Sequence, residues 1–282
     1  MILAREAPVG VVFRRGPSKW VRLYRWDTRT DRLEPGQWFH GRLYERRCDL
    51  SPDGSLLIYF AAKHGGARRR DPRYTYAWTA ISKPPWLSAL ALWPKGDCWH
   101  GGGLFLSARS LWLNHRPEVA RAHPDHKPKG LRVVANPEAY GEDEPVYWRR
   151  LARDGWVLSQ PGHYVHVRGS WKTERPLIWS RRRGVWNLHM VQLAIDFARA
   201  GGPRVLEYRL THPSGRALAL DADGWADWDA TGRLVYVRRG RLYAAELDAH
   251  AGLRESELAD LSAAVPQPAQ APTSASRWTW KH

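Results

Sequence analysis

The stretch Cys48-Asp49-Leu50-Ser51-Pro52-Asp53-Gly54-Ser55-Leu56-Leu57-Ile58-Tyr59 decides how this chain is interpreted. A second stretch, Ala226-Asp227-Trp228-Asp229-Ala230-Thr231-Gly232-Arg233-Leu234-Val235-Tyr236, follows the same pattern. Each passes from an acidic residue through a polar turn with glycine into a strand of large apolar residues. Such a turn between apolar arms is typical of a β-hairpin. Two copies far apart in the chain therefore predict a closed or stacked all-β architecture.

The bulk composition indicates a globular protein with a sizeable core. The chain has 282 residues, of which 43% are hydrophobic and 26% are charged. These values exclude a disordered chain. No apolar run approaches the roughly 18 residues that a membrane helix needs, and the N-terminal residues lack a long apolar signal core. With two cysteines that we expect to be reduced and buried, the sequence predicts a cytoplasmic protein that does not bind a membrane.

Short strands separated by turns account for most of the chain. Val9 to Phe13, Trp20 to Trp26, Leu56 to Ala62 and Tyr74 to Ile81 are rich in β-branched and aromatic residues. An Asp154-Gly155 turn between two apolar arms predicts a hairpin over residues 145–158. Val205 to Leu247 is expected to form a self-contained meander of four strands, and Leu253 to Leu261 a short helix. The segment around His189 to Arg199 fits either a helix or a strand.

The spacing of the glycine turns predicts a propeller. Gly54, Gly103, Gly155, Gly184 and Gly232 mark candidate blade hairpins, and most lie about 50 residues apart. The predicted fold is a small β-propeller of about five four-stranded antiparallel blades. The alternative is a β-sandwich with a second small β domain. Residues 1–261 are expected to form a single domain, and residues 262–282 an extended C-terminal tail that docks on it.

The phrase from Leu50 to Tyr59 resembles the Ser-Pro-Asp-Gly hairpin of the WD-repeat-like bacterial propellers. In that family the motif joins the first two strands of a blade, with Asp and Gly in the turn. Asp227 to Tyr236 is similar to a looser copy, in which Ala230-Thr231 replaces Pro-Asp. The resemblance implies a propeller and implies no activity, because propellers serve as scaffolds, hydrolases, lyases and lectins.

Arginine clusters are the main candidate binding feature. The chain carries 44 basic and 28 acidic residues, a formal net charge of +16, which is compatible with nucleic acid or another polyanion. Several clusters flank or occupy predicted turns, which would gather on one rim if the blades repeat. The candidate polyanion-binding residues are Arg68, Arg69, Arg70, Arg73, Arg149, Arg150, Arg181, Arg182 and Arg183. The opposing interpretation is separate solvated turns on both rims.

Tryptophan is the second unusual component, with 17 residues. An indole suits core packing between sheets and also stacking on sugars, bases or cations. Trp148 and Trp179 lie beside the arginine clusters and are the candidate stacking residues. We expect most of the other tryptophans to fill the core.

The sequence offers no complete set of catalytic or metal-binding residues. His123 and His126 flank Asp125, but spacing supplies no fourth zinc ligand. Asp221, Asp223, Asp227 and Asp229 lack the glycine and glutamate positions of a calcium loop. Cys98 and His100 have no visible third group to orient the imidazole, and no Gly-x-Ser-x-Gly elbow occurs. No catalytic residue, metal or cofactor is therefore predicted.

Three functions remain open at this point. The first expectation is a non-catalytic propeller that binds a protein partner across one rim, so that an enzyme is the less favoured class. The second is binding of nucleic acid or another polyanion through the arginine-rich turns. The third is a carbohydrate-active hydrolase or lyase with a central pocket, which would need opposed carboxylates and exposed tryptophans.

Overall fold

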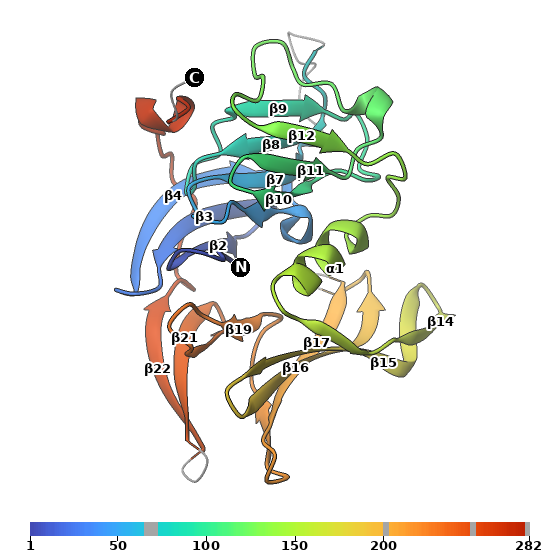
Figure 1. The fold of residues 1–282 in the computed structure, drawn as a ribbon, viewed down its shortest axis with the longest axis vertical. Coiled ribbons are helices and arrows are strands. Elements are labelled where there is room, and N and C mark those ends of the chain that lie inside the picture. Colours follow the sequence, from blue (N-terminus) through green and yellow to red (C-terminus); the bar gives the residue numbers. More distant parts are fainter. Residues whose placement is uncertain (65–72, 200–202, 249–251, 280–282) are drawn as a thin grey trace. The chain divides into compact units, whose positions relative to one another are not determined.

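The computed structural model describes residues 1–64, 73–199, 203–248 and 252–279 (Figure 1). The chain divides into two compact units. The first comprises Met1–Arg150 with Val265–His282, and the second comprises Leu151–Ala264. Each is described by itself. The prediction of a single domain over residues 1–261 stays a prediction.

Three sheets make up the first unit. Their strands are β1 (Ile2–Leu3), β2 (Val9–Arg15), β3 (Trp20–Asp27) and β4 (Arg32–His40); β5 (Arg42–Leu43), β6 (Asp49–Leu50), β7 (Leu57–Ala62), β8 (Ala77–Ser82) and β9 (Ala91–Pro94); and β10 (Gly103–Ser107), β11 (Ser110–Leu113) and β12 (Arg132–Ala135). Two short 3₁₀ turns, Glu45–Arg47 and Pro117–Val119, interrupt the connections. The strands predicted at Val9 to Phe13 and Trp20 to Trp26 are confirmed as the hairpin β2–β3, and β10 pairs with β11 in a second hairpin. All pairings are antiparallel except β11 with β12.

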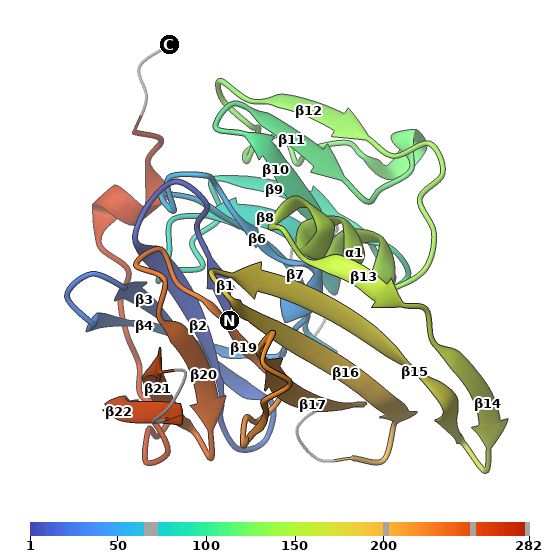
Figure 2. The ribbon, with the colours of Figure 1, turned by 60° about the horizontal axis from the view of Figure 1, so that its bottom comes forward.

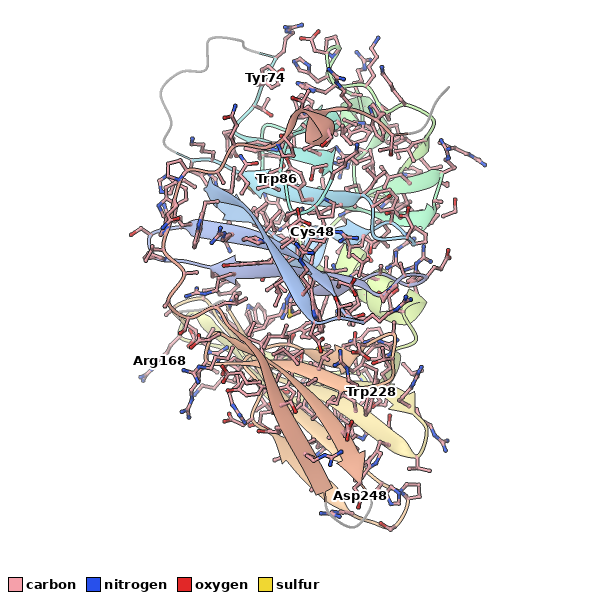
Figure 3. The ribbon with its side chains drawn as sticks, turned by 90° about the vertical axis from the view of Figure 1, so that its left-hand side faces the viewer. Cys48, Tyr74, Trp86, Arg168, Trp228 and Asp248 are labelled. Carbon is pink, nitrogen blue, oxygen red and sulfur yellow. The ribbon has the colours of Figure 1, made fainter. Side chains whose placement is uncertain are left out.

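Strand β7 is buried on both faces, as its continuous apolar sequence predicts. Leu57, Tyr59 and Ala61 pack into a core with β2 and β3. Ile58, on the opposite face, packs with Phe105 and residues of β11. The sheet that contains β7 therefore lies between two others in this unit, and Figure 3 shows Cys48 deep among its side chains.

Both copies of the repeated phrase form hairpins. In the first, Asp49 pairs with Ile58, and in the second Asp227 pairs with Val235. The turns need glycine, because Gly54 has a φ of 71° and Gly232 a φ of 91°, in the left-handed region that other residues rarely adopt. The prediction of a repeated strand–turn–strand unit is confirmed.

The second unit contains two antiparallel sheets (Figure 2). Its strands are β13 (Val157–Gln160), β14 (His163–Val167), β15 (Ser170–Arg183), β16 (Trp186–Asp196), β17 (Arg204–Thr211) and β18 (Ala217–Leu220), then β19 (Ala226–Trp228), β20 (Leu234–Arg238), β21 (Arg241–Asp248) and β22 (Gly252–Asp260). Figure 3 shows Asp248 at the far end of β21 and Trp228 at β19. The ambiguous segment at His189 is strand β16.

The predicted meander from Val205 to Leu247 is wrong in its boundaries. Strands β17 and β18 belong to the sheet of β13–β16, whereas β19 begins a new sheet whose last strand is β22. Tyr208 pairs with Leu220 in the first sheet, and Arg241 pairs with Asp260 in the second. The sequence shows apolar strands at an even spacing, and that spacing carries no information about which neighbour each strand joins.

The hairpin predicted at Asp154-Gly155 is also wrong, because Glu144–Arg153 forms helix α1. Pro145 lies in the first turn, where a missing N–H costs no hydrogen bond. Val146 is fully buried and Leu151 nearly so. Gly155 has a φ of 87°, and its N–H donates to the Ala152 carbonyl. The dipeptide therefore ends a helix instead of joining two strands.

The helix expected from Leu253 to Leu261 is replaced by strand β22. Its charged side chains find partners on neighbouring strands. Glu255 pairs with Arg238 at 3.0 Å, and Glu257 pairs with Arg241 at 3.1 Å. Cross-strand pairs of opposite charge favour the strand, so tertiary context overrides the helical propensity.

The C-terminal segment packs within the first unit. Ala275 is buried in the short turn Thr273–Ser276. Lys83 Nζ donates to the Ser274 carbonyl at 2.8 Å, and Trp278 packs against the core of β7, β9 and β11.

The architecture is all-β, with several largely antiparallel sheets and one α-helix among the described residues. Each sheet ends in edge strands within those residues, and none closes on itself. In the same part of the chain no helix is long and apolar enough to span a bilayer.

Candidate active site

The six-stranded sheet of the second unit has an apolar face and a mixed face, on which Ile178 and Val191 are buried beside polar side chains. Trp179, Leu188, Met190 and Leu210 are buried on the first face. Because neighbouring residues of a strand alternate, the residues between them point the other way. There, Ser180 lies opposite His189 across β15 and β16. Asn187 lies opposite Thr211, and His189 opposite Arg209, across β16 and β17.

Three of these side chains form a hydrogen-bonded chain that we call the relay: Ser180, His189 and Thr211. Ser180 Oγ lies 2.7 Å from His189 Nδ1. Thr211 Oγ1 lies 2.8 Å from His189 Nε2. Both ring nitrogens are thereby engaged by hydroxyl groups from two different strands, which fixes the plane of the imidazole.

Ser159, at the edge of the sheet, determines which atom donates in each hydrogen bond of the relay. Its hydroxyl donates to the Ile178 carbonyl at 3.1 Å and lies 2.8 Å from Ser180 Oγ. Because Ser159 has only one proton, Ser180 donates to Ser159 and accepts the proton on His189 Nδ1. His189 Nε2 is left with its lone pair, which accepts from Thr211. The network thus assigns one tautomer of the neutral imidazole.

Electrostatics favour the neutral imidazole. Burial lowers the pKa of His189 below its ordinary value of 6.5, and the nearby positive charge of Arg209 lowers it further. A neutral imidazole at neutral pH can accept a proton, which a general base requires.

Asn187 and Arg209 bring side-chain N–H donors to the same face of the sheet as the Thr211 hydroxyl. Asn187 is its direct cross-strand partner, and Arg209 lies two residues earlier on the same strand. Arg209 is exposed and Asn187 is half-buried. A hydroxyl, an oriented base and nearby donors together form the arrangement that nucleophilic catalysis needs.

The three consecutive arginines predicted to bind polyanions do not act as one group. Arg181 binds Asp227, whose carboxyl is half-buried and whose pKa is raised by desolvation. Arg182 is exposed on the relay face, and its Nε donates to the Gly184 carbonyl at 3.0 Å. Arg183 lies against Gly232. Alternation along β15 places Arg182 on the face opposite Arg181 and Arg183, and the latter two have different neighbours.

The other predicted arginines that the structure describes lie in the first unit. Arg73 pairs with Asp125 at 3.2 Å on the surface. The Arg149 guanidinium lies over the Trp112 ring at 4.7 Å. Arg150 is buried and donates to the carbonyls of Glu45 and Cys48, so its role in this structure is structural. Arg68, Arg69 and Arg70 lie outside the described residues. Polyanion binding stays a prediction.

The two predicted stacking residues differ in accessibility. Trp148 is 39% exposed on α1, whereas Trp179 is only 5% exposed within β15. An indole buried in a sheet core has no free face, so Trp179 cannot stack on a ligand in this conformation. Stacking by Trp148 stays a prediction.

The histidines considered for zinc are engaged by the protein. His126 Nε2 lies 2.9 Å from Tyr74 Oη, and its Nδ1 lies 3.1 Å from the Ala89 carbonyl. The Asp125 N–H donates to His123 Nδ1. Across the described ranges, no group of three or more His, Cys, Asp or Glu side chains is arranged to hold a metal.

Sequence reasoning missed the relay. Ser180, His189 and Thr211 have no motif spacing, because their proximity depends on the register of three strands. One signal was available: His189 in a possible strand next to Ser180 across the predicted Arg181–Gly184 turn. That hairpin register alone brings these two residues together, whereas Thr211 depends on the pairing of β16 with β17.

Comparisons with known proteins give little further guidance. No family model matches the chain, and no curated protein matches it. One solved structure that resembles it is titled a crystal structure of a putative 6-phosphogluconolactonase from Bacteroides fragilis. The match covers 90% of this chain and 97% of that one, at 10% identity and a TM-score of 0.31. A likeness of this size assigns no activity to the chain.

The first functional prediction, a non-catalytic module that binds a protein partner through one rim, is corrected by the structure. The described residues include a hydrogen-bonded chain of two hydroxyl groups and an imidazole, which is an arrangement found in catalytic sites.

Proposed function

We propose that this protein is a hydrolase that cleaves an ester bond through the Thr211–His189–Ser180 relay. The observation that carries the proposal is the 2.8 Å contact between Thr211 Oγ1 and His189 Nε2, combined with the Ser180 contact to the other ring nitrogen. A nucleophile, a base and a group that orients the base recur in this geometry on unrelated folds.

In the first step, Thr211 Oγ1 attacks the carbonyl carbon of the ester while His189 Nε2 takes the hydroxyl proton. The imidazolium then gives that proton to the departing alcohol oxygen as the carbon–oxygen bond breaks. This leaves an acyl group on Thr211. Throughout, Ser180 Oγ accepts a hydrogen bond from His189 Nδ1–H, and this bond keeps the ring in place.

In the second step, water attacks the acyl carbonyl, and His189 again accepts a proton and returns it to Thr211 Oγ1. A carboxylic acid is released, and the enzyme is regenerated. In both steps negative charge develops on the carbonyl oxygen. Asn187 and Arg209 are the side chains placed to stabilise it, because they flank Thr211 on the same face of the sheet.

The charge of this face supports an anionic substrate. Arg182 and Arg209 are both exposed on the relay face, and Arg182 lies opposite Asn187. An ester of a carboxylated or phosphorylated alcohol or sugar would place its anionic group between these guanidinium groups. This agrees with the hydrolase alternative and leaves its central pocket unassigned.

We infer that the propeller prediction applies at the level of modules. Strands β1–β4 and β19–β22 are each four-stranded antiparallel meanders in chain order, as a propeller blade is. The arrangement of about five such modules around an axis stays a proposal.

A panel of anionic and neutral chromogenic esters tests the proposed hydrolase. The intact protein should hydrolyse at least one ester, and Thr211→Val and His189→Gln should each lower kcat by about 10²- to 10⁴-fold. Thr211→Ser should retain activity, because it keeps a hydroxyl. Circular dichroism would show that each variant is folded.

His212 and Ser214 provide a matched control in the same unit. His212 Nδ1 lies 2.8 Å from Ser214 Oγ in an exposed turn, and within the described residues no second hydroxyl contacts its other nitrogen. His212→Gln should leave hydrolysis unchanged. Loss of activity in this variant alone, or full activity in Thr211→Val, would refute the proposal.

A further inference from the structure

Two exposed aromatic residues lie on adjoining loops of the first unit. Trp99 is 65% exposed and Tyr140 is 58% exposed. The loops meet where the His100 N–H donates to the Gly141 carbonyl at 3.0 Å. Asn114 Nδ2 also donates to the Tyr140 carbonyl at 3.4 Å. Each aromatic residue therefore directly precedes one of the two residues that join the loops.

A buried arginine holds both loops in place. Arg47 has no exposed surface. Its Nη1 donates to the carbonyls of Cys98 and His100 in one loop. Its Nε and Nη2 bind Asp143 and Glu142 in the other, at 2.9 and 3.0 Å. One rigid guanidinium thus holds the main chain of the first loop and two carboxylate side chains of the second.

The first loop is also constrained by its own backbone. Asp97 Oδ1 accepts the Trp99 N–H at 2.9 Å. His100 has a φ of 54°, which is unusual for a residue other than glycine. A strained backbone held by its surroundings is a common property of binding loops.

Carboxylate groups lie beside the aromatic residues. Asp97 and Glu142 have 47% and 57% of their side chains exposed. Asp97 is held by Lys95 at 2.8 Å, and one oxygen of Glu142 is bound by Arg47. The remaining lone pairs can accept hydrogen bonds from a ligand.

We infer that Trp99, Tyr140, Asp97 and Glu142 form a binding surface for a neutral saccharide. Aromatic rings present flat apolar faces that match the C–H faces of sugar rings. Fixed carboxylates accept hydrogen bonds from sugar hydroxyl groups. The two carboxylates disfavour an anionic polymer, although the chain is strongly basic overall. The inference does not depend on the proposed hydrolase, because the relay lies in the other unit.

Affinity electrophoresis of the intact chain tests this surface. The gels would contain soluble starch, xylan or hydroxyethyl cellulose, and a glycan array of neutral oligosaccharides would widen the set of probes. We expect at least one neutral glycan to bind. Trp99→Ala and Tyr140→Ala should each weaken binding on the order of tenfold, the effect of losing one stacking contact.

Trp171→Ala is the matched control, because Trp171 is 40% exposed in the second unit. It should bind like the unaltered protein. Binding should also persist at high salt, where attraction to polyanions is screened. The inference is overturned if no neutral glycan binds, if Trp99→Ala binds normally, or if Trp171→Ala or added salt abolishes binding.

Discussion

Thr211 and His189 lie diagonally across two neighbouring strands, with Thr211 Oγ1 2.8 Å from His189 Nε2. The direct partner of Thr211 is Asn187, two residues before His189 on the same face. The imidazole spans the two-residue offset between His189 and Thr211, and its other nitrogen contacts Ser180 on the opposite neighbouring strand. A sheet can therefore hold a hydroxyl and a base in contact without a strained turn, and both come from rigid strands.

Hydrolysis should depend on pH through His189. Burial and Arg209 lower the pKa of this imidazole below 6.5, so it is already neutral at pH 7. The rate should rise with pH along an acid limb whose midpoint lies below 6.5, then reach a plateau. Arg209→Gln removes a positive charge that disfavours the imidazolium, and should move the midpoint upward. A pH profile of kcat would test both; a midpoint above 7 in the unaltered protein would contradict the assignment.

Stability should fall in mild acid because of His115. This residue is fully buried, its Nε2 lies 2.7 Å from Thr79 Oγ1, and burial lowers its pKa to about 4. The unfolded chain binds a proton near pH 6.5, whereas the folded chain does not. Above pH 6.5 His115 is neutral in both states and does not reduce the free energy of unfolding. As the pH falls from 6.5 to 4, that free energy decreases by roughly 3 kcal/mol.

Urea unfolding at several pH values would measure this effect. His115→Gln should flatten the dependence of the unfolding free energy on pH between 6.5 and 4, whatever its effect at pH 7. An equally steep dependence in the variant would place the responsible group elsewhere.

Arg47 should contribute far more to stability than a surface arginine does. Arg47→Met removes the guanidinium that donates to two carbonyls and binds two carboxylates. A buried acceptor that loses its donor typically costs about 1–3 kcal/mol, so the two carbonyls alone should cost several times what a surface pair does. Arg15 pairs with Glu45 at 2.7 Å, but 46% of its side chain is exposed, so Arg15→Met should cost less than about 1 kcal/mol. Equal unfolding free energies for the two variants would argue against the loop clamp.

The two repeated turns should differ in their tolerance of a side chain. Gly232→Ala should cost about 1–2 kcal/mol from its left-handed backbone alone, because only the flexible end of Arg183 is near. Gly54→Ala should cost more, because the added Cβ would lie 2.7 Å from Val9 Cβ. Thermal denaturation of both variants would rank them, and the reverse order would show that the turns are packed differently.

The sequence predicted the strands better than their partners. The continuous apolar sequence of residues 57–62 correctly indicates a strand buried on both faces, because such a run reports local burial. The Asp154-Gly155 turn failed, because the same dipeptide can end a helix. The prediction that β17 and β18 belong to one meander with the strands that follow was wrong, because the packing of the whole unit decides which distant strands pair.

The candidate site was less predictable for the same reason. Ser180, His189 and Thr211 have no significance as a linear pattern, since their contact depends on two registers at once. The arginine triplet at 181–183 was visible in the sequence, but the alternation of β15 places Arg182 on the opposite face from the other two. Burial of Trp179 depends on which face of that strand meets the core, and composition does not determine this.

Active-site labelling tests the central claim most directly. The intact protein would be incubated with an acylating β-lactone or activated-ester probe, and its peptides analysed by mass spectrometry. The relay predicts a single acyl adduct on Thr211 that disappears in His189→Gln and persists in His212→Gln. An adduct on another residue, or no adduct on Thr211 under conditions of measurable turnover, would contradict it.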